Sequence, residues 1–135
     1  MELNEITSQI IAAAMKVHSE LGPGLLESVY ATCLRHELQK AGLRVQSQVS
    51  VPVLYEGMHL ESGYRMDLLV EDKVIVELKC VEKILPISKA QLLTYLRLAN
   101  KPLGLLLNFN VVHMRDGITR ILNNRYRPAS AAGAS

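Results

Sequence analysis

Apolar residues in the first part of the chain recur at the spacing of helices. Between residues 3 and 20 they lie three or four positions apart, which places them on one face of a helix. The segment LGPG at 21–24 ends this helix, because glycine and proline do not comfortably continue one. A second helix is predicted from about Leu25 to Lys40, with Gly42 as its C-cap.

The middle of the chain has the pattern of strands. Residues 45–54 are rich in β-branched side chains, and Pro52 within them indicates an edge strand or a bulge. Residues 59–70 predict a long strand with a bend at Gly63. After a short polar connection, the apolar run 74–79 predicts a strand that returns alongside the second one.

The remaining elements complete a sheet that is covered by helices. A third helix is predicted at about 88–100, after Pro86, and the continuous apolar run 103–109 predicts a strand buried on both faces. Residues 111–114 and 118–122 are predicted to form a closing pair of strands. The order α-α-β-β-β-α-β indicates an α/β fold with a mixed central β-sheet flanked by helices.

Length and composition fit one domain with its own core. The chain has 135 residues, of which 49% are apolar and 21% charged, an ordinary globular composition. We predict a single domain over residues 1–126 and a mobile tail over 127–135, where the sequence is RPASAAGAS. The net charge of +2 leaves room for a local basic groove, so it decides neither for nor against nucleic acid.

Several classes of protein are disfavoured by simple features. Cys33 and Cys80 lie far apart and form no CxxC pattern, so we expect neither zinc nor a disulfide framework, and a reducing cytoplasmic location is predicted. The N-terminal segment lacks the basic start of a signal peptide. Its apolar run is interrupted by Lys16 and His18, so we expect no membrane span.

Two carboxylates occupy positions where apolar residues are expected. Asp67 lies in the run YRMDLLV and Glu77 in the run VIVELK. If residues 71–73 form a three-residue hairpin loop, Val70 pairs with Val74, and Asp67 then lies opposite Glu77. Opposite residues on antiparallel strands project to one side, with Cβ atoms about 5 Å apart. Two carboxylates at that distance repel each other unless one is protonated or a cation lies between them.

The negative charge of the two carboxylates can be compensated in two ways. Lys79 shares a face with Glu77 and supplies part of the charge, and a divalent metal would supply more. A buried ion pair with the lysine is equally consistent with the spacing. Arg65 shares a face with Asp67, where it is either a salt-bridge partner or a contact to phosphate.

Polar residues on two helices extend the candidate site. Glu27 falls inside the apolar arc of the second helix, with Leu34 and Leu38, so it faces the sheet. Alternatively, Glu27 serves its own helix, because a carboxylate in the first turn favours the helix dipole and bonds a free N–H. Gln91 and Tyr95 lie at i, i+4 on one edge of the third helix.

The ordered motifs resemble those of one known family. They are GLLESVY (24–30), Asp67 after Tyr64-Arg65, ELK (77–79) and QLLTY (91–95). Together they resemble the GxxExxY family, which is similar to a compact member of the PD-(D/E)XK nuclease superfamily with the motif order of RecB-like nucleases. The resemblance covers about residues 4–123, and it departs from the superfamily pattern at Met66, where proline often precedes the aspartate.

The resemblance implies a fold and a chemistry. The fold is a restriction-endonuclease-like core, and the activity is metal-dependent hydrolysis of phosphodiester bonds in DNA or RNA. The implied metal is Mg²⁺, or Mn²⁺, because hard oxygen ligands suit these ions. Its implied ligands are Glu27, Asp67, Glu77 and the carbonyl of Leu78.

The resemblance also implies roles for the remaining polar residues. Asp67, Glu77 and Lys79 are the implied catalytic residues, and Lys79 orients or helps to deprotonate the attacking water. The residues implied to hold the nucleic-acid backbone or to support the site are Gln91, Tyr95, Tyr30 and Arg65.

Two other functions remain open at this point. One is a non-catalytic nucleic-acid-binding or assembly protein that retains the nuclease fold. The other is a structural dimer in which the acidic residues and the lysine form a buried ion network. A homodimer is also expected for a nuclease this short, and its apolar first helix is either the interface or a cover for the sheet.

Overall fold

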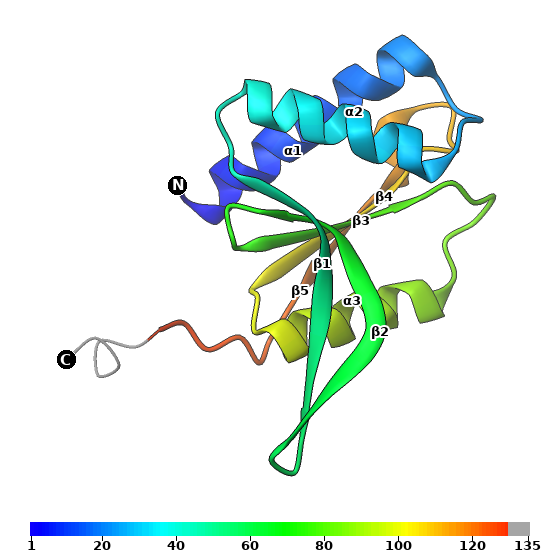
Figure 1. The fold of residues 1–135 in the computed structure, drawn as a ribbon. Coiled ribbons are helices and arrows are strands. Elements are labelled where there is room, and N and C mark those ends of the chain that lie inside the picture. The colour runs from blue at the N-terminus through cyan, green and yellow to red at the C-terminus, as the bar shows by residue number, and fades with distance from the viewer. Residues whose placement is uncertain (130–135) are drawn as a thin grey trace.

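The structure, a computed structural model that describes residues 1–129, is built on one mixed β-sheet with helices on both faces (Figure 1). The elements are α1 (Leu3–Leu21), α2 (Glu27–Lys40), β1 (Val45–Tyr55), β2 (Met58–Val70), β3 (Val74–Lys79), α3 (Pro86–Ala99), β4 (Leu103–Asn108), the 3₁₀ helix η1 (Met114–Gly117) and β5 (Ile118–Leu122). The strands lie side by side in chain order. This arrangement confirms the predicted α/β fold.

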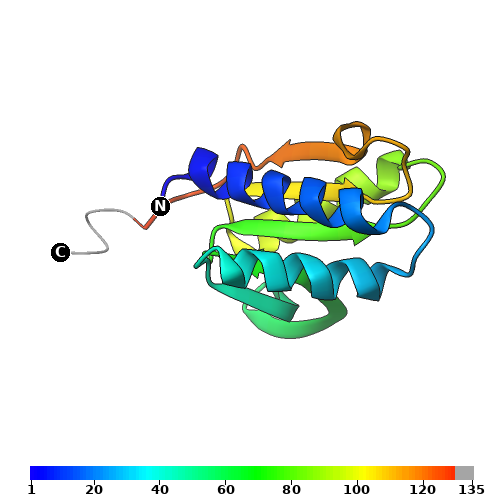
Figure 2. The same cartoon turned by 90° about the horizontal axis from the view of Figure 1, so that it is seen from above.

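The sheet is antiparallel except at its centre. Strands β3 and β4 are parallel, and α3 makes the crossover that parallel neighbours need. Helices α1 and α2 cover one face of the sheet and run side by side, roughly along the direction of the central strands, as Figure 2 shows, while α3 covers the other face. Strand β1 lies at the edge, as Pro52 predicted.

The larger apolar cluster lies between the sheet and helices α1 and α2, and we call this side the paired-helix face. Each helix contributes residues three or four positions apart, because these share one side of a helix. The fully buried members include Ile6, Ile10, Leu34, Leu38, Val74, Val76, Leu103 and Leu107. Burying one such side chain stabilises the fold by about 1.5–3 kcal/mol. Along β3 this face is apolar from end to end.

The smaller cluster lies under α3, and we call this side the α3 face. Its buried residues are Val51, Met66, Leu69, Ile75, Leu92, Tyr95, Leu96 and Leu106. Along β3 the α3 face is apolar only at Ile75, because side chains alternate and Glu77 and Lys79 occupy its next two positions. The two faces of one strand therefore differ in chemistry.

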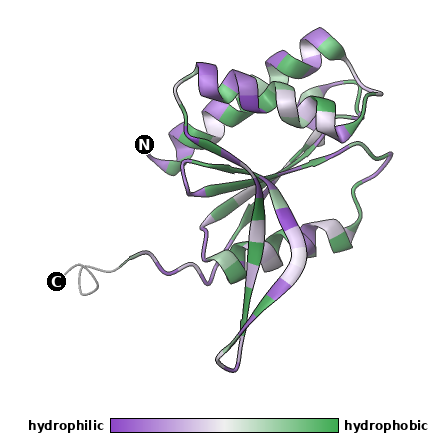
Figure 3. Cartoon of the chain, viewed as in Figure 1, coloured by the Kyte–Doolittle hydropathy of each residue, from purple (hydrophilic) through white to green (hydrophobic). Residues whose placement is uncertain are grey.

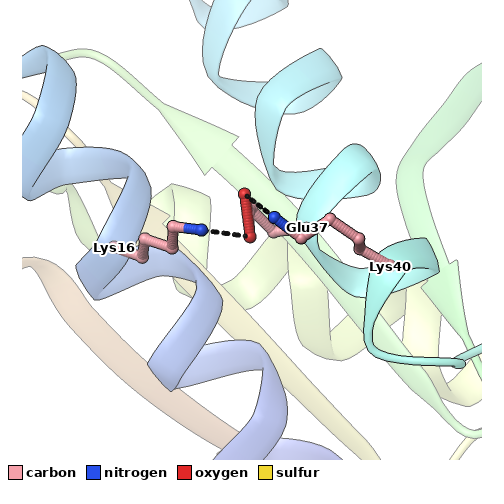
Figure 4. Close-up of polar contacts among 3 residues, drawn as sticks. All are labelled: Lys16, Glu37 and Lys40. Carbon is pink, nitrogen blue, oxygen red and sulfur yellow. Dashed lines mark hydrogen bonds and ion pairs between the residues drawn. The ribbon is translucent and has the colours of Figure 1, made fainter.

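Glu37 links α1 and α2 at the rim of the paired-helix face. Its carboxylate lies 3.1 Å from Lys16 Nζ and 3.5 Å from Lys40 Nζ (Figure 4). The hydrogen bond from Lys16 holds the pKa of Glu37 below its ordinary value. Exposed ion pairs stabilise little, so we attribute the docking of the two helices to their apolar contacts.

The hairpin of β1 and β2 extends beyond the rest of the sheet, and we call its outer residues 51–64 the wing (Figure 1). The pairing register shifts between Ser50 and Pro52, and Gly63 has a φ of 80°, which confirms the predicted bend. Apolar segments continue into the wing, as the green colouring in Figure 3 shows. Its exposed apolar residues are Leu54, Tyr55, Met58, Leu60 and Tyr64.

The hairpin changes sides of the sheet at Gln48 and Asp67. Leu68 packs in the paired-helix cluster, whereas Met66, two residues away, packs in the α3 cluster. In a regular strand these two side chains would point to the same side. Gln48 lies opposite Asp67 in the register and has a φ of 54°, which is outside the extended range of strands. The chain twists here strongly enough to exchange its faces.

The predicted pair of closing strands is wrong in its first half. Residues 111–114 form no strand, and β5 pairs with β4 instead. Gly117 lies so close to the end of β4 that a Cβ there would collide with the Asn108 carbonyl oxygen. The chain therefore turns tightly as η1 over the end of β4, and this leaves no place for a separate hairpin.

Two helices begin at slightly different residues from those predicted. Helix α3 starts at Pro86, because proline fits the first turn of a helix. Helix α2 starts at Glu27, with the extended Leu26 as its N-cap. Each helix within residues 1–129 is either too short or too polar to span a bilayer.

The start of the predicted tail is tied to the body of the protein. The Arg127 N–H donates to Asn100 Oδ1 at 3.1 Å, and Asn100 Nδ2 donates to the Arg127 carbonyl at 2.9 Å. Residues 130–135 of the predicted tail lie outside the described residues.

Candidate functional site

The ladder between β2 and β3 ends where the two predicted carboxylates begin. Its register pairs Val70 with Val74 and ends with Leu68 opposite Val76, as a three-residue loop requires. The continuation of this register would place Asp67 opposite the next residue of β3, which is Glu77. We call this end of the ladder the fork.

At the fork, each carboxylate bonds the backbone of the other strand. The Asp67 N–H donates to Glu77 Oε2 at 3.1 Å, and the Leu78 N–H donates to Asp67 Oδ2 at 2.8 Å. These side chains take the place of the carbonyl acceptors that a continuous ladder would supply. Asp67 and Glu77 are therefore fixed side by side, as the hairpin register predicted.

The electrostatics of the fork favour a neutral Glu77. Its side chain is 9% exposed, and burial raises its pKa to about 9, with further increases from its hydrogen bond to Asp67 and from the Asp67 charge. The backbone hydrogen bond from Asp67 and the charge of Lys79 oppose this rise in pKa but do not cancel it. At neutral pH the structure thus relieves carboxylate repulsion by keeping a proton on Glu77.

Glu27 points to the sheet rather than to its own helix start. Its Oε2 accepts a hydrogen bond from the Cys80 N–H at 3.1 Å, just beyond the end of β3. The N-cap of α2 has no side-chain hydrogen bond. The capping interpretation is therefore wrong as far as a hydrogen bond is concerned, although the position of Glu27 in the first turn still favours the helix dipole.

A hollow of about 290 Å³ brings Glu27 and Asp67 to one place. Its lining residues are Glu27, Ser28, Ala31, Gln48, Asp67 and Leu78. Gln48 was not predicted from the sequence, because nothing in a polar strand segment marks the residue that breaks the extended conformation. Once β1 and β2 are in register, its position opposite Asp67 identifies it.

Lys79 and Arg65 form no ion pairs with the carboxylates of the fork. Four ion pairs are present within residues 1–129, and none includes Asp67, Glu77, Lys79 or Arg65. Arg65 Nη1 instead donates to the Gln48 carbonyl at 3.3 Å, so the predicted salt bridge to Asp67 is wrong. The twist of the hairpin explains this, since it carries Arg65 away from the face that Asp67 shares with Leu69. The predicted buried ion network is likewise not formed by these residues.

Tyr95 lies beside the fork, and Gln91 lies one helical turn before it. Tyr95 is buried in the α3 cluster, and burial raises its pKa to about 12, with smaller contributions from Glu77, Tyr64 and Asp67. The hydroxyl is therefore neutral at any physiological pH. Gln91 is half-buried on the same helix. The structure brings Tyr95 to the carboxylates from the α3 side.

Tyr30 supports the site without reaching it. Its hydroxyl donates to the Gly22 carbonyl at 2.5 Å and accepts from the Leu25 N–H at 3.1 Å. Its ring stacks on Phe109, with 4.5 Å between the centroids. These contacts fix the loop before α2, in which Gly24 has a φ of 99°. They explain physically why a glycine and a tyrosine flank Glu27 at this spacing.

Asn108 is a second supporting residue that the sequence did not reveal. It is buried at the end of β4, and its amide bonds both the N–H and the carbonyl of Val81, at 3.2 and 2.9 Å. It also accepts from the Asn110 N–H at 3.1 Å. The amide thereby holds the segment that follows Lys79. In the sequence, Asn108 could have been noticed only as a single amide side chain near the end of a run of apolar residues.

The donor set fits a hard divalent ion that keeps part of its water shell. Within residues 1–129, no three His, Cys, Asp or Glu side chains converge closely enough to hold a metal by themselves. Asp67 and Glu77 are adjacent, and Leu78 lines the same hollow as Asp67 and Glu27. Mg²⁺ is commonly held by one or two carboxylates and several waters, so a third direct carboxylate is not required.

Comparison with known proteins gives one match. The family model described as the PD-(D/E)XK nuclease superfamily matches residues 4–121. No curated protein and no solved structure matches the chain. The matched residues include the fork, the start of α2 and all of α3, so the match covers every part of the candidate site.

Proposed function

The chain belongs to the PD-(D/E)XK nuclease superfamily, and from this premise we propose that it is a metal-dependent nuclease that hydrolyses phosphodiester bonds of DNA or RNA. The observation that carries the proposal is the fork, where Asp67 and Glu77 are held side by side with Lys79 next along β3. Within residues 1–129 no lysine or arginine forms an ion pair with either carboxylate, so both are available to a divalent cation once Glu77 loses its proton.

We propose that Asp67, Glu77 and the Leu78 carbonyl hold Mg²⁺ or Mn²⁺, and that Glu27 completes the shell through water. When bound, the ion supplies positive charge to the phosphate and lowers the pKa of water. Glu77 would have to give up its proton to serve as a ligand, so metal binding would release a proton. Within residues 1–129 no three acidic side chains converge closely enough to bind one ion directly, which supports a role for Glu27 through water.

Lys79 is the residue to which we assign the proton and charge chemistry. Its ammonium orients the attacking water, helps its deprotonation and stabilises the negative charge that develops on the phosphate. The half-buried position of Lys79, without an ion-pair partner in the described residues, keeps its charge available to substrate. Tyr95 and Gln91 support the site from α3, and Tyr30 does so through the loop before α2. Arg65 retains free donors for the nucleic-acid backbone.

Several finer assignments belong to the same proposal. Within the superfamily we assign the chain to the GxxExxY family, because the contacts of Gly24, Glu27 and Tyr30 give that motif a physical purpose. We propose an endonuclease that acts as a homodimer, since so short a chain offers little surface to a duplex. Both cysteines are free thiols, which supports a reducing cytoplasmic location.

A cleavage screen tests the activity. Single-stranded, duplex and branched DNA and RNA are incubated with Mg²⁺ or Mn²⁺ and with wild type, Lys79→Ala or Lys73→Ala. Lys79→Ala should lower the cleavage rate by about 10²–10⁴-fold, the usual contribution of a proton-transfer group. Lys73→Ala is the matched control, because Lys73 lies in the loop at the other end of β3.

The outcomes separate the proposal from its alternative. Equal cleavage by wild type and Lys79→Ala would remove Lys79 from the mechanism. Binding of metal and nucleic acid without cleavage of any substrate would favour a non-catalytic nucleic-acid-binding or assembly protein that retains the nuclease fold.

A further inference from the structure

Tyr64 is an exposed aromatic residue next to the candidate site. Its side chain is 59% exposed, although it lies on β2 three residues before Asp67. Its ring centroid lies 6.4 Å from that of the buried Tyr95, with the two planes tilted by 40°. Tyr95 in turn lies beside the carboxylates of the fork. One edge of Tyr64 is thus packed against the site and the rest faces solvent.

The backbone around Tyr64 is built to hold that ring in place. Ser62 Oγ donates to the Val51 carbonyl at 2.9 Å and accepts from the Tyr64 N–H at 3.1 Å. Gly63 lies between them with a φ of 80°, and this is where the register of the hairpin shifts. Bulges of this kind are known to re-aim a side chain near an active site.

Tyr64 lines a hollow on the wing that is large enough for a nucleobase. The hollow has a volume of about 400 Å³ and extends from Ser50 to Val53 on β1 and from His59 to Arg65 on β2. Arg65 is exposed and also lines the hollow, and one N–H group of its guanidinium already bonds the Gln48 carbonyl. The hollow therefore combines an aromatic surface with a cation whose other N–H groups are free for phosphate.

We propose that Tyr64 is a stacking platform for one unpaired base of a single-stranded nucleic acid, and that Arg65 contacts the adjacent phosphate. This inference rests on the proposed nuclease function, since it places the base next to the bond to be cut. A base in a duplex is already stacked on its neighbours and offers no face to Tyr64. Stacking on an aromatic side chain tolerates any base, so the expected preference is for strand state rather than sequence.

The wing supplies a matched control for Tyr64. Tyr55, at the end of β1, is also 59% exposed, but it does not line the hollow and has no aromatic partner within residues 1–129. If exposed tyrosines merely add general affinity, Tyr55→Ala and Tyr64→Ala should behave alike. If Tyr64 is a platform, only its own substitution should weaken binding.

The experiment measures binding separately from cleavage. Fluorescein-labelled oligothymidylate and oligouridylate of about 12 nucleotides, within the roughly 4–16 that compact single-strand binding domains occupy, are titrated with full-length protein in Mg²⁺. All variants carry Lys79→Ala so that the probe stays intact, and a labelled duplex of equal length is measured in parallel. Fluorescence anisotropy gives each Kd.

Tyr64→Ala should weaken binding of the single strand by about 5- to 150-fold, which corresponds to one base stack. Tyr64→Phe, which keeps the ring, and Tyr55→Ala should each stay within about twofold of the parent. Tyr64→Leu guards against a packing effect, because it keeps apolar bulk against Tyr95 without a ring, and it should behave like Tyr64→Ala. Urea unfolding of each variant verifies that the fold is retained.

Several outcomes would overturn the inference. Among the variants, these are unchanged binding by Tyr64→Ala, an equal loss of affinity in Tyr64→Ala and Tyr64→Phe, or full binding by Tyr64→Leu. Among the probes, they are an equal loss of affinity for duplex and single strand, or no binding of either single-stranded probe. The inference and the proposed function fail separately. Tyr64-dependent binding by a protein that cleaves no substrate refutes only the nuclease. Suppose instead that the protein with native Lys79 cleaves single strands and that Tyr64→Ala leaves its kcat/KM unchanged. This result would refute only the platform.

Discussion

The two faces of β3 differ in polarity although they belong to one short strand. On the paired-helix face, Val74, Val76 and Leu78 are all buried in the larger apolar cluster. On the α3 face, only Ile75 is part of a cluster, and Glu77 and Lys79 follow it. The first face resembles any protein core, whereas the second changes from core to polar site within three residues.

This difference teaches how a small domain keeps a polar site inside its sheet. The carboxylates of the fork are acceptable because backbone N–H groups bond them and because Glu77 holds a proton. The stability they cost is offset on the opposite face, which has no polar residue along β3. Along β3 the apolar and the polar side chains therefore lie on opposite sides of the same backbone, and the two sets should respond separately to substitution and to pH.

The largest effect is expected from pH acting on Glu77 in metal-free protein. Its pKa is about 9 in the folded protein, against an ordinary value of 4.5. Between these values the folded state keeps a proton that the unfolded state releases, so stability is fully present below about pH 4.5 and falls as pH rises through about 9. Each unit of difference between the two pKa values corresponds to about 1.4 kcal/mol, so the free energy of unfolding should fall by several kcal/mol.

Urea unfolding in chelator from about pH 5 to about pH 9 measures this loss. Glu77→Gln is the matched variant, because its amide oxygen still accepts from the Asp67 N–H but does not titrate. It should be much less sensitive to pH than wild type. Equal slopes in the two proteins would mean that another group causes the pH dependence.

The next effect is expected on the paired-helix face. Leu105→Ala in β4 removes a side chain that is 1% exposed in the larger cluster. The lost burial and the cavity should reduce the free energy of unfolding by about 2–5 kcal/mol, measured with urea. Metal affinity of the folded variant should not change, because Leu105 does not line the hollow that holds Glu27 and Asp67. A large loss of metal affinity in folded protein would show that the two faces are coupled.

The third effect concerns metal binding at the fork. At a Mg²⁺ or Mn²⁺ concentration of about 100 times Kd, wild type should gain about 2.7 kcal/mol in stability. Asp67→Asn should lose this gain, although its amide oxygen still accepts from the Leu78 N–H and so preserves the fork. Thermal unfolding with and without metal gives the comparison. Asp72→Asn, in the exposed hairpin loop, is the control and should respond as wild type does.

The smallest effect is expected from Glu37, the carboxylate at the rim of the paired-helix face. Its pKa is lowered by Lys16, so it contributes stability above its ordinary pKa and loses this as pH falls through the lowered value. The sign is opposite to that of Glu77. Urea unfolding of Glu37→Gln at neutral pH should show a small loss that salt largely abolishes, because Lys16 and Lys40 are exposed to solvent and Glu37 is only half-buried. A loss that persists in high salt would contradict a surface ion pair.

The sequence predicted the fork because its geometry follows from short-range rules. The three-residue loop fixed Val70 opposite Val74, and alternation then put Glu77 and Lys79 on one face of β3. These rules hold because β3 is short and lies flat between two neighbours. The position of Glu27 in the first turn of its helix favoured capping, and only the fold shows that its carboxylate bonds the Cys80 N–H instead.

The same alternation rule failed in β2. It put Arg65 beside Asp67, but the twist at Gln48 reverses the sides of the hairpin, and the expected salt bridge is not formed. Before residue 68, β2 pairs only with β1, so this part has fewer neighbours to hold it flat, and no residue type in the segment marks the reversal. The predicted strand at 111–114 failed for a tertiary reason, because the close approach of Gly117 to Asn108 is decided by packing.

The bonds exchanged between Asp67 and Glu77 also bear on how the chain avoids misfolding. If β3 slipped by one residue along β2, Glu77 would turn into the apolar paired-helix face. The slip would also take the carboxylate acceptors away from the N–H groups of Asp67 and Leu78. The mispaired hairpin is thus destabilised in two ways. A carboxyl group is buried among apolar side chains, and two backbone N–H groups lose their hydrogen bonds. The two residues that we propose as metal ligands would in this way also favour the correct pairing of the sheet.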